Sequence, residues 1–138
     1  MNSGYLLDTN VLSETRKRSP DPNVISFLSS ADSTGIYLSV LTLGELRKGV
    51  AMKQHSDAVA ASQLAVWVEG LQTHFSKRIL SIDAATAKLW GDLSAQRPRP
   101  VIDTLLAATA ITHDLTLVTR NTRDVEDTGV RFLDPWSQ

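Results

Sequence analysis

Short apolar runs alternate along this chain with longer stretches of helical periodicity. Each short run is bounded by polar or turn-forming residues, which is typical of a buried strand. The predicted strands cover residues 5–7, 35–38, 79–82, 115–119 and 130–133. The stretches between them repeat apolar side chains at the spacing of an amphipathic helix. The predicted helices cover residues 9–17, 23–30, 40–52, 58–75, 84–96 and 101–113.

Strands that alternate with helices of this length need crossover connections, and such connections produce a mostly parallel sheet. We therefore expect an α/β fold, a three-layer α/β/α sandwich around a sheet of roughly four or five strands. Polar residues mark where several of the helices begin. Thr9 or Asn10 is expected to cap the first helix, Ser39 the third and Asp83 the fifth.

Composition narrows the class of protein. The 138 residues fit one domain, 1–138. The absence of cysteine excludes disulfides, thiolate zinc sites and cysteine nucleophiles. Fourteen basic residues against fifteen acidic ones give a net charge of −1, so no global positive charge points to nucleic acid. The chain begins with no basic and apolar leader and contains no membrane-length apolar run, so we expect a cytoplasmic protein without membrane contact.

Acidic residues follow several predicted strands, at the edge where parallel α/β sheets bind ligands. Asp8 directly follows the first strand, and Glu45 lies in the second turn of the helix after the second strand. Asp103 lies in the first turn of the helix after the proline-rich loop, and Asn121 and Asp124 follow the fourth strand. Parallel topology can bring these side chains to one rim although they are far apart in the sequence.

Clustered carboxylates repel one another, so a fold that gathers several of them needs a cation between them. Oxygen ligands suit a hard divalent ion such as Mg²⁺, for which Mn²⁺ is a common substitute. Such an ion can activate water and neutralise charge on a phosphodiester. Taken singly, however, Asp8 is typical of a cap, Glu45 of a solvated helix face, and Asp103 of a first helical turn. Periodicity alone supports only an α/β domain.

Four segments in register change this interpretation. They are residues 6–14 (LLDTNVLSE), 38–49 (LSVLTLGELRKG), 103–110 (DTLLAATA) and 117–124 (LVTRNTRD), with LDPW at 133–136 near the end. Together they resemble the motifs of PIN-domain ribonucleases, and most closely the VapC and FitB toxins of bacterial toxin–antitoxin modules. The resemblance covers nearly the whole chain and implies a single PIN-like nuclease domain.

The resemblance also implies site residues and a cofactor. A Mg²⁺- or Mn²⁺-dependent endoribonuclease of this kind would bind metal through Asp8 and Asp103 directly, and through Glu45 by way of water or a second ion. Asn121 stands where many PIN domains carry an acid. Either Asn121 orients the attacking water, or Asp124 supplies the missing carboxylate from one turn further along.

Partners follow from the same resemblance: an RNA substrate, a cognate antitoxin that fills the active-site groove, and a second copy in a homodimer or a larger hetero-oligomer. Operator DNA would be bound only through the antitoxin. Basic residues near the motifs are candidates for contacts to the RNA backbone: Arg16, Lys17, Arg18, Arg47, Lys48, Arg97, Arg99, Arg120 and Arg123.

Two alternatives remain at this stage. A catalytically silent PIN-like interaction module would keep the fold and bind metal weakly, and Asn121 leaves this open. A phosphotransfer domain using Asp8 is disfavoured because no second Asp follows two residues later and no glycine-rich phosphate loop is present.

Overall fold

The computed structural model describes residues 4–137, and within them it contains a five-stranded sheet. The strands are β1 Tyr5–Leu7, β2 Ile36–Ser39, β3 Ile79–Leu80, β4 Thr116–Val118 and β5 Phe132–Leu133. Their order across the sheet is β3-β2-β1-β4-β5, and every neighbouring pair is parallel. The predicted parallel sheet is confirmed, with several strands shorter than predicted.

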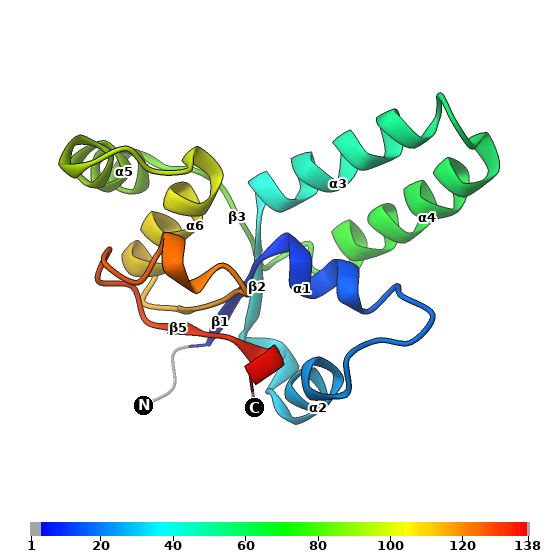
Figure 1. Ribbon diagram of the computed structural model, residues 1–138, viewed down its shortest axis with the longest axis horizontal. Helices are drawn as coiled ribbons and strands as arrows, with labels where there is room; N and C mark the ends of the chain where they lie inside the picture. The colour runs from blue at the N-terminus through cyan, green and yellow to red at the C-terminus, as the bar shows by residue number, and fades with distance from the viewer. Residues whose placement is uncertain (1–3, 138) are drawn as a thin grey trace.

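Helices cover both faces of this sheet. They are α1 Thr9–Glu14, α2 Pro22–Ser30, α3 Val40–Lys53, α4 Ala58–His74, α5 Ala84–Gln96 and α6 Val101–Thr112. Short 3-10 helices, which the sequence did not predict, are η1 Ser33–Gly35, η2 Thr122–Asp124 and η3 Pro135–Ser137. Figure 1 shows α5 and α6 on one side of the sheet and α1 to α4 on the other, so the expected three-layer sandwich is confirmed. Within residues 4–137, no helix combines the length and the hydropathy needed to cross a bilayer.

Neighbouring side chains of β1 enter two different apolar cores. Leu7 packs with Val11 of α1 and Val68 of α4, whereas Leu6 packs with Leu106 and Ala107 of α6. Because successive strand residues point to opposite faces, a strand that is apolar at both positions has to be covered on both sides. The polar residues that interrupt such a strand can therefore lie only at its ends, which fixes where the site forms.

Two helices begin at the capping residue that the sequence predicts, and one helix begins at a different residue. The side chains of Ser39 and Asp83 each accept a hydrogen bond from a backbone N–H in the first turn, so both predicted caps are confirmed. The predicted cap of α1 was wrong. Asp8, rather than Thr9 or Asn10, is the N-cap, and its carboxylate accepts a hydrogen bond from the Thr9 backbone. The aspartate predicted for the site therefore also begins the helix.

α1 ends at Glu14 instead of the predicted residue 17. The backbone N–H groups of Thr15, Arg16 and Lys17 donate to carbonyls three residues back, which forms tight turns rather than further α-helix. The Glu14 carboxylate pairs with Lys17 at 2.9 Å and accepts a hydrogen bond from the Asp21 backbone at 2.8 Å. This buried acid therefore directs the chain from α1 towards α2.

We expect Gly4→Ala to destabilise the fold more than Gly129→Ala. Gly4, just before β1, has a φ of +104°, and a β-carbon there would collide with the carbonyl oxygen of Gly35. Gly129 has a φ of +87° with open space around it. Gly4→Ala should lower the free energy of unfolding by about 2–4 kcal/mol, and Gly129→Ala by about 1–2 kcal/mol. Urea denaturation measures both, and equal losses would contradict the role of the collision.

Candidate functional site

Asp8 lies at the carboxyl end of β1, and both of its carboxylate oxygens accept hydrogen bonds. The Thr9 backbone N–H donates to Oδ1 at 2.6 Å, and the Thr119 hydroxyl donates to Oδ2 at 2.8 Å. The parallel register that pairs Leu7 with Val118 places Thr119 beside Asp8. The Asp8 side chain is buried, at 5% exposure, and this burial raises its pKa against the opposing effect of the two hydrogen bonds. Asp8 is thus a fixed, partly desolvated carboxylate.

Glu45 reaches the same edge of the sheet from α3. We call this edge, with Asp8, Glu45, Asp103 and Asp124, the rim. It is exposed, and its Oε1 accepts a hydrogen bond from the Thr9 hydroxyl at 2.6 Å. Thr9 therefore contacts two of the predicted acids, Asp8 through its backbone and Glu45 through its side chain. Repulsion from Glu45 contributes to the raised pKa of Asp8. The first turn of α1 thus joins the end of β1 to the second turn of α3.

Asp103, in the first turn of α6, completes the convergence. Its pKa is raised to about 6, first by burial and then by repulsion from Asp8 and Asp124, with a smaller contribution from Glu45. Its side chain also contacts that of Asp124 in a hydrogen bond that favours the protonated acid. The structure therefore places the other three predicted acids close enough for their charges to act on Asp103, although the four come from separate segments of the chain.

The oxygen-rich rim suits a divalent cation, but its side chains do not already form a closed cage. Among residues 4–137, no three acids or histidines are arranged so that they could hold a metal ion together. The Thr9 hydroxyl donates to Glu45, and the Thr119 hydroxyl donates to Asp8. The charges that raise the pKa of Asp103 are all carboxylates, and a hard cation among them would offset this repulsion. Carboxylate oxygens are the ligand type that hard divalent cations prefer.

Asn121 joins the rim through its backbone. Its N–H donates to the Thr119 hydroxyl oxygen at 3.0 Å, and Thr119 in turn donates to Asp8. Asn121 is the N-cap of η2, but its side chain makes no capping hydrogen bond there. The half-buried amide of Asn121 is thereby left for other partners, while Asp124 at the end of η2 contacts Asp103.

Sequence reasoning missed the two threonines that position these acids. Thr9 directly follows Asp8 and Thr119 directly follows the apolar pair Leu117-Val118, but a hydroxyl at such a position is also an ordinary cap or turn residue. What identifies Thr119 is the strand order, because only the pairing of β1 with β4 sets it beside Asp8. The strand order cannot be predicted from the local sequence of either strand.

Two of the basic residues predicted to contact RNA do something else. Arg97 and Arg99 both donate to the Asp127 carboxylate, at 2.9 and 2.8 Å. Arg99 also donates to the Leu93 carbonyl and to Gln96, and its side chain is only 2% exposed. The prediction of a backbone contact to RNA was therefore wrong for Arg99, which links the end of α5 to the segment after η2.

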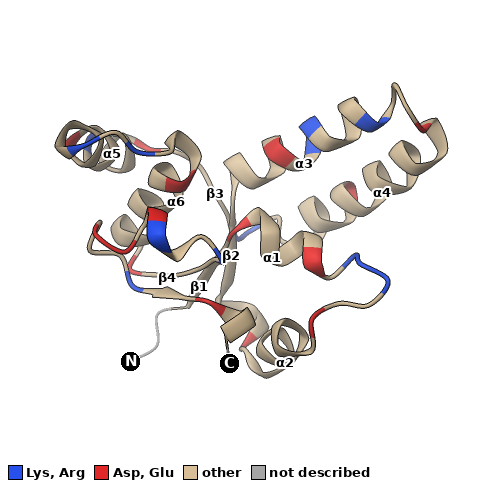
Figure 2. Ribbon diagram, in the orientation of Figure 1, with Lys and Arg blue, Asp and Glu red and all other residues tan. Residues whose placement is uncertain are grey.

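Other cations remain at the surface near the rim. Arg16 lies over the ring of Trp67 at 5.2 Å, and Arg120 lies over Trp136 at 4.4 Å. Figure 2 shows acidic positions of α3 and α6 near the upper end of the sheet, with basic positions on α3 and on the turn that follows β4. The exposed ones include Arg47, Lys48 and Arg123. Local charge is thus of both signs around the acids.

Comparisons with known proteins agree with this geometry. The PIN domain family matches residues 5–129. The VapC ribonuclease Y4jK of Sinorhizobium fredii is 33% identical, over 95% of this chain and 96% of its own length. Toxin FitB of Neisseria gonorrhoeae is 32% identical, over 95% of this chain and 97% of its own length. The structure of FitAB bound to a DNA fragment superposes with a TM-score of 0.85 at 30% identity, covering 96% of this chain and 95% of that one.

The carboxylate cluster predicts a pH-dependent stability in the absence of metal. Because the pKa of Asp103 is about 6 in the folded protein against an ordinary 3.8, its protonated form stabilises the fold at low pH. That contribution is lost as the pH rises from about 4 through about 6. Asp103→Asn should therefore melt at a higher temperature than the wild type at pH 7 and at the same temperature at pH 4.

Thermal melts followed by circular dichroism test this, with Asp92→Asn on the exposed face of α5 as the matched control. Added Mg²⁺ or Mn²⁺ at pH 7 should raise the melting temperature of the wild type more than that of Asp103→Asn. A variant that is less stable than the wild type at pH 7 would contradict the repulsion that we describe.

Proposed function

The chain belongs to the PIN-domain family, and on that basis we propose that it is a metal-dependent endoribonuclease, the toxin of a type II toxin–antitoxin system. The observation that carries this proposal is the convergence of Asp8, Glu45, Asp103 and Asp124 at the carboxyl edge of a parallel sheet. The ribonuclease and toxin names of relatives that match along nearly their whole lengths support it.

We propose that Asp8 and Asp103 hold Mg²⁺, or Mn²⁺ in its place, with Asp124 as a further ligand. When bound, such an ion lowers the pKa of water and neutralises charge on a phosphodiester. With such an ion in place, Glu45 would act as a proton acceptor or would hold a second ion through water, and its Oε1 already accepts from Thr9. The amide of Asn121, which makes no capping hydrogen bond, would orient the attacking water.

Thr119 has the clearest supporting role in this proposal. By donating to Oδ2 it keeps the lone pairs of Asp8 in one orientation, and hydrogen bonds of this kind tune the ligands of metal sites. Thr9 does the same for Asp8 and for Glu45. The raised pKa of Asp103 means that a cation competes with a proton for this carboxylate near pH 6.

We further propose that an antitoxin protein neutralises this chain, and that the pair binds operator DNA through the antitoxin. The FitAB assembly on DNA supports this, because its toxin is similar to this chain along nearly its whole length. In the same proposal the toxin pairs with a second copy of itself in the cytoplasm. The alternative, a silent interaction module, is less consistent with the hydroxyl hydrogen bonds that orient Asp8 and Glu45.

Removal of the acids should abolish RNA cleavage while the fold persists. In Asp8→Asn or Asp103→Asn, the rate with Mg²⁺ or Mn²⁺ should fall by more than the roughly 100-fold that loss of an outer-shell partner can cause. Cleavage of varied RNA pools by antitoxin-free protein, with and without chelator, measures this. Asp92→Asn, a charge change at an exposed side chain of α5, should cleave as the wild type does. Undiminished cleavage by both site variants would refute the proposal.

Thr119→Val should weaken metal binding without loss of the fold. Valine matches the shape of this buried threonine but cannot donate to Asp8, so Mn²⁺ affinity should fall about 10- to 100-fold. Titration calorimetry measures the affinity directly. Thr86→Val is the matched control, because this buried hydroxyl bonds instead to Thr112 on α6 at 2.8 Å. Equal Mn²⁺ affinity in the two variants would exclude a positioning role for Thr119.

A further inference from the structure

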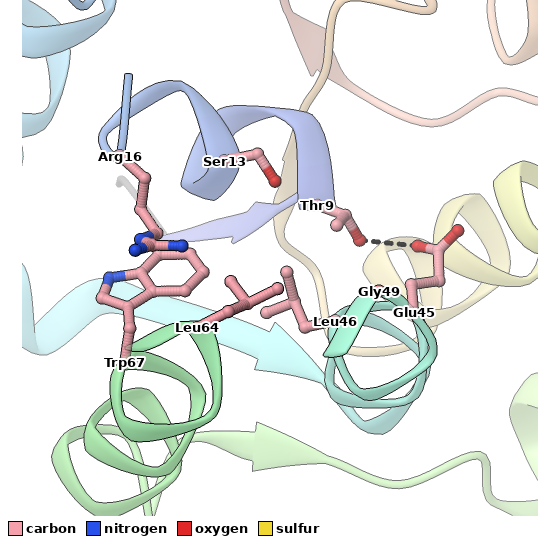
Figure 3. A pocket seen from close by; sticks show the side chains of 8 residues that line it. All are labelled: Thr9, Ser13, Arg16, Glu45, Leu46, Gly49, Leu64 and Trp67. Carbon is pink, nitrogen blue, oxygen red and sulfur yellow. Dashed lines mark hydrogen bonds between the residues drawn. The ribbon is translucent and has the colours of Figure 1, made fainter. Parts of the chain in front are cut away.

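A pocket of about 280 Å³ opens beside the acidic rim, between α1, α3 and α4. Figure 3 shows Thr9 and Glu45 at one end and Arg16 lying over Trp67 at the other, with Leu46 and Leu64 between them. The pocket therefore begins at a carboxylate of the rim and ends at a stacked cation and indole.

The walls of this pocket combine flat apolar surface with a few polar groups. Leu46 and Leu64 supply aliphatic surface, and Trp67 supplies an aromatic ring. The Arg16 guanidinium lies 5.2 Å from the centre of that ring. The Ser13 hydroxyl also lines the pocket. Planar guanidinium and indole groups beside aliphatic side chains are the surfaces on which unpaired nucleobases stack, while hydroxyl and guanidinium groups can bond their edges.

A glycine keeps the pocket open. Gly49 on α3 lines it, and a β-carbon added there would lie 3.8 Å from a methyl group of Leu64, an ordinary contact distance. A larger side chain at this position would therefore extend along Leu64 and fill the space without colliding with the backbone. Glycine costs stability within a helix, so its presence here matches a requirement for volume.

The pocket is continuous with the candidate active site through two shared residues. Thr9 donates to Asp8 and Glu45, and both Thr9 and Glu45 line the pocket. An RNA strand whose phosphate lies at the carboxylates would therefore carry a neighbouring nucleotide to the mouth of the pocket. The exposed Arg16 adds positive charge at the far end, where a second phosphate or a base edge would lie.

We propose that this pocket binds one unpaired nucleobase of the RNA substrate, next to the phosphodiester that is cut. The inference rests on the proposed ribonuclease function and deepens it, because it places the selection of unpaired RNA in the lining residues Ser13, Arg16, Gly49, Leu64 and Trp67. The base enters between the leucines and the stacked Arg16–Trp67 pair, while its backbone stays at the acidic rim.

The test uses single-stranded RNA oligonucleotides in which one abasic nucleotide is moved along the sequence around a mapped cleavage site. With the antitoxin-free wild type and Mn²⁺, removal of one base near the cut should lower kcat/KM about 10-fold, as loss of a stacked base does. In Gly49→Leu, the intact oligonucleotide should be cut about 10-fold more slowly, and the abasic change at that position should have no further effect.

Gly70→Leu is the matched control, since it makes the same substitution on the exposed face of α4, where nothing lies within 4 Å. It should behave as the wild type does. Arg16→Ala, at an exposed position where loss of the fold is not expected, should reproduce the insensitivity to the abasic change. Lys88→Ala removes a positive charge from a side chain on α5 that is 84% exposed, and so controls for the lost charge. This variant should remain sensitive to the abasic nucleotide.

The outcomes separate the two proposals. If the wild type cleaves RNA, and Gly49→Leu and Arg16→Ala depend on the abasic position as the wild type does, the base pocket is overturned. The proposed ribonuclease function is then unaffected. The same two variants could keep the wild-type abasic profile and cause growth arrest that co-expressed antitoxin no longer relieves. That result would assign the pocket to the protein partner and would also overturn the base pocket. A folded wild type that cuts no RNA with Mg²⁺ or Mn²⁺ would overturn both.

Discussion

The parallel pairing of β1 with β4 is the constraint on which the site depends. It sets Leu7 beside Val118, and Asp8 continues the ladder by donating its own backbone N–H to the Val118 carbonyl at 2.9 Å. From that position the carboxylate both caps α1 and accepts the Thr119 hydroxyl. A shift of one residue in this register would turn Asp8 to the other face of the sheet and bury it against an apolar core. The register of β1 against β4 thus determines the geometry of the site.

The same arrangement collects charge that the fold alone does not neutralise. Asp8 is held by a backbone amide and a hydroxyl, which favour its ionised form, while burial and Glu45 oppose that form. Asp103 has no such support among the causes of its pKa shift, and its pKa of about 6 reflects burial and three neighbouring acids. The protein therefore carries an electrostatic cost at neutral pH that a divalent cation would remove, so a cation bound at these residues would also stabilise the fold.

Local sequence was enough to predict the layers and the sheet, because buried parallel strands read as short apolar runs and the helices between them read as amphipathic. It was also enough to identify the acids that converge, once four motifs were taken together. It did not identify Asp8 as the cap of α1, since Thr9 and Asn10 are equally good capping residues by type. Nor could it find Thr119 or the Arg99–Asp127 pair, because these contacts join segments whose proximity only the tertiary structure sets.

A net charge of −1 conceals an uneven distribution that matters for an RNA-cutting enzyme. Both Arg97 and Arg99 pair with Asp127, and the buried Arg99 therefore holds the fold rather than a substrate. The guanidinium groups of Arg16 and Arg120 instead lie over the rings of Trp67 and Trp136, at 5.2 and 4.4 Å from the ring centres. Stacking on an aromatic ring restricts where each guanidinium lies. The surface can then combine the carboxylates proposed to bind metal with cations that attract phosphate, and the two signs cancel in the composition while acting separately in space.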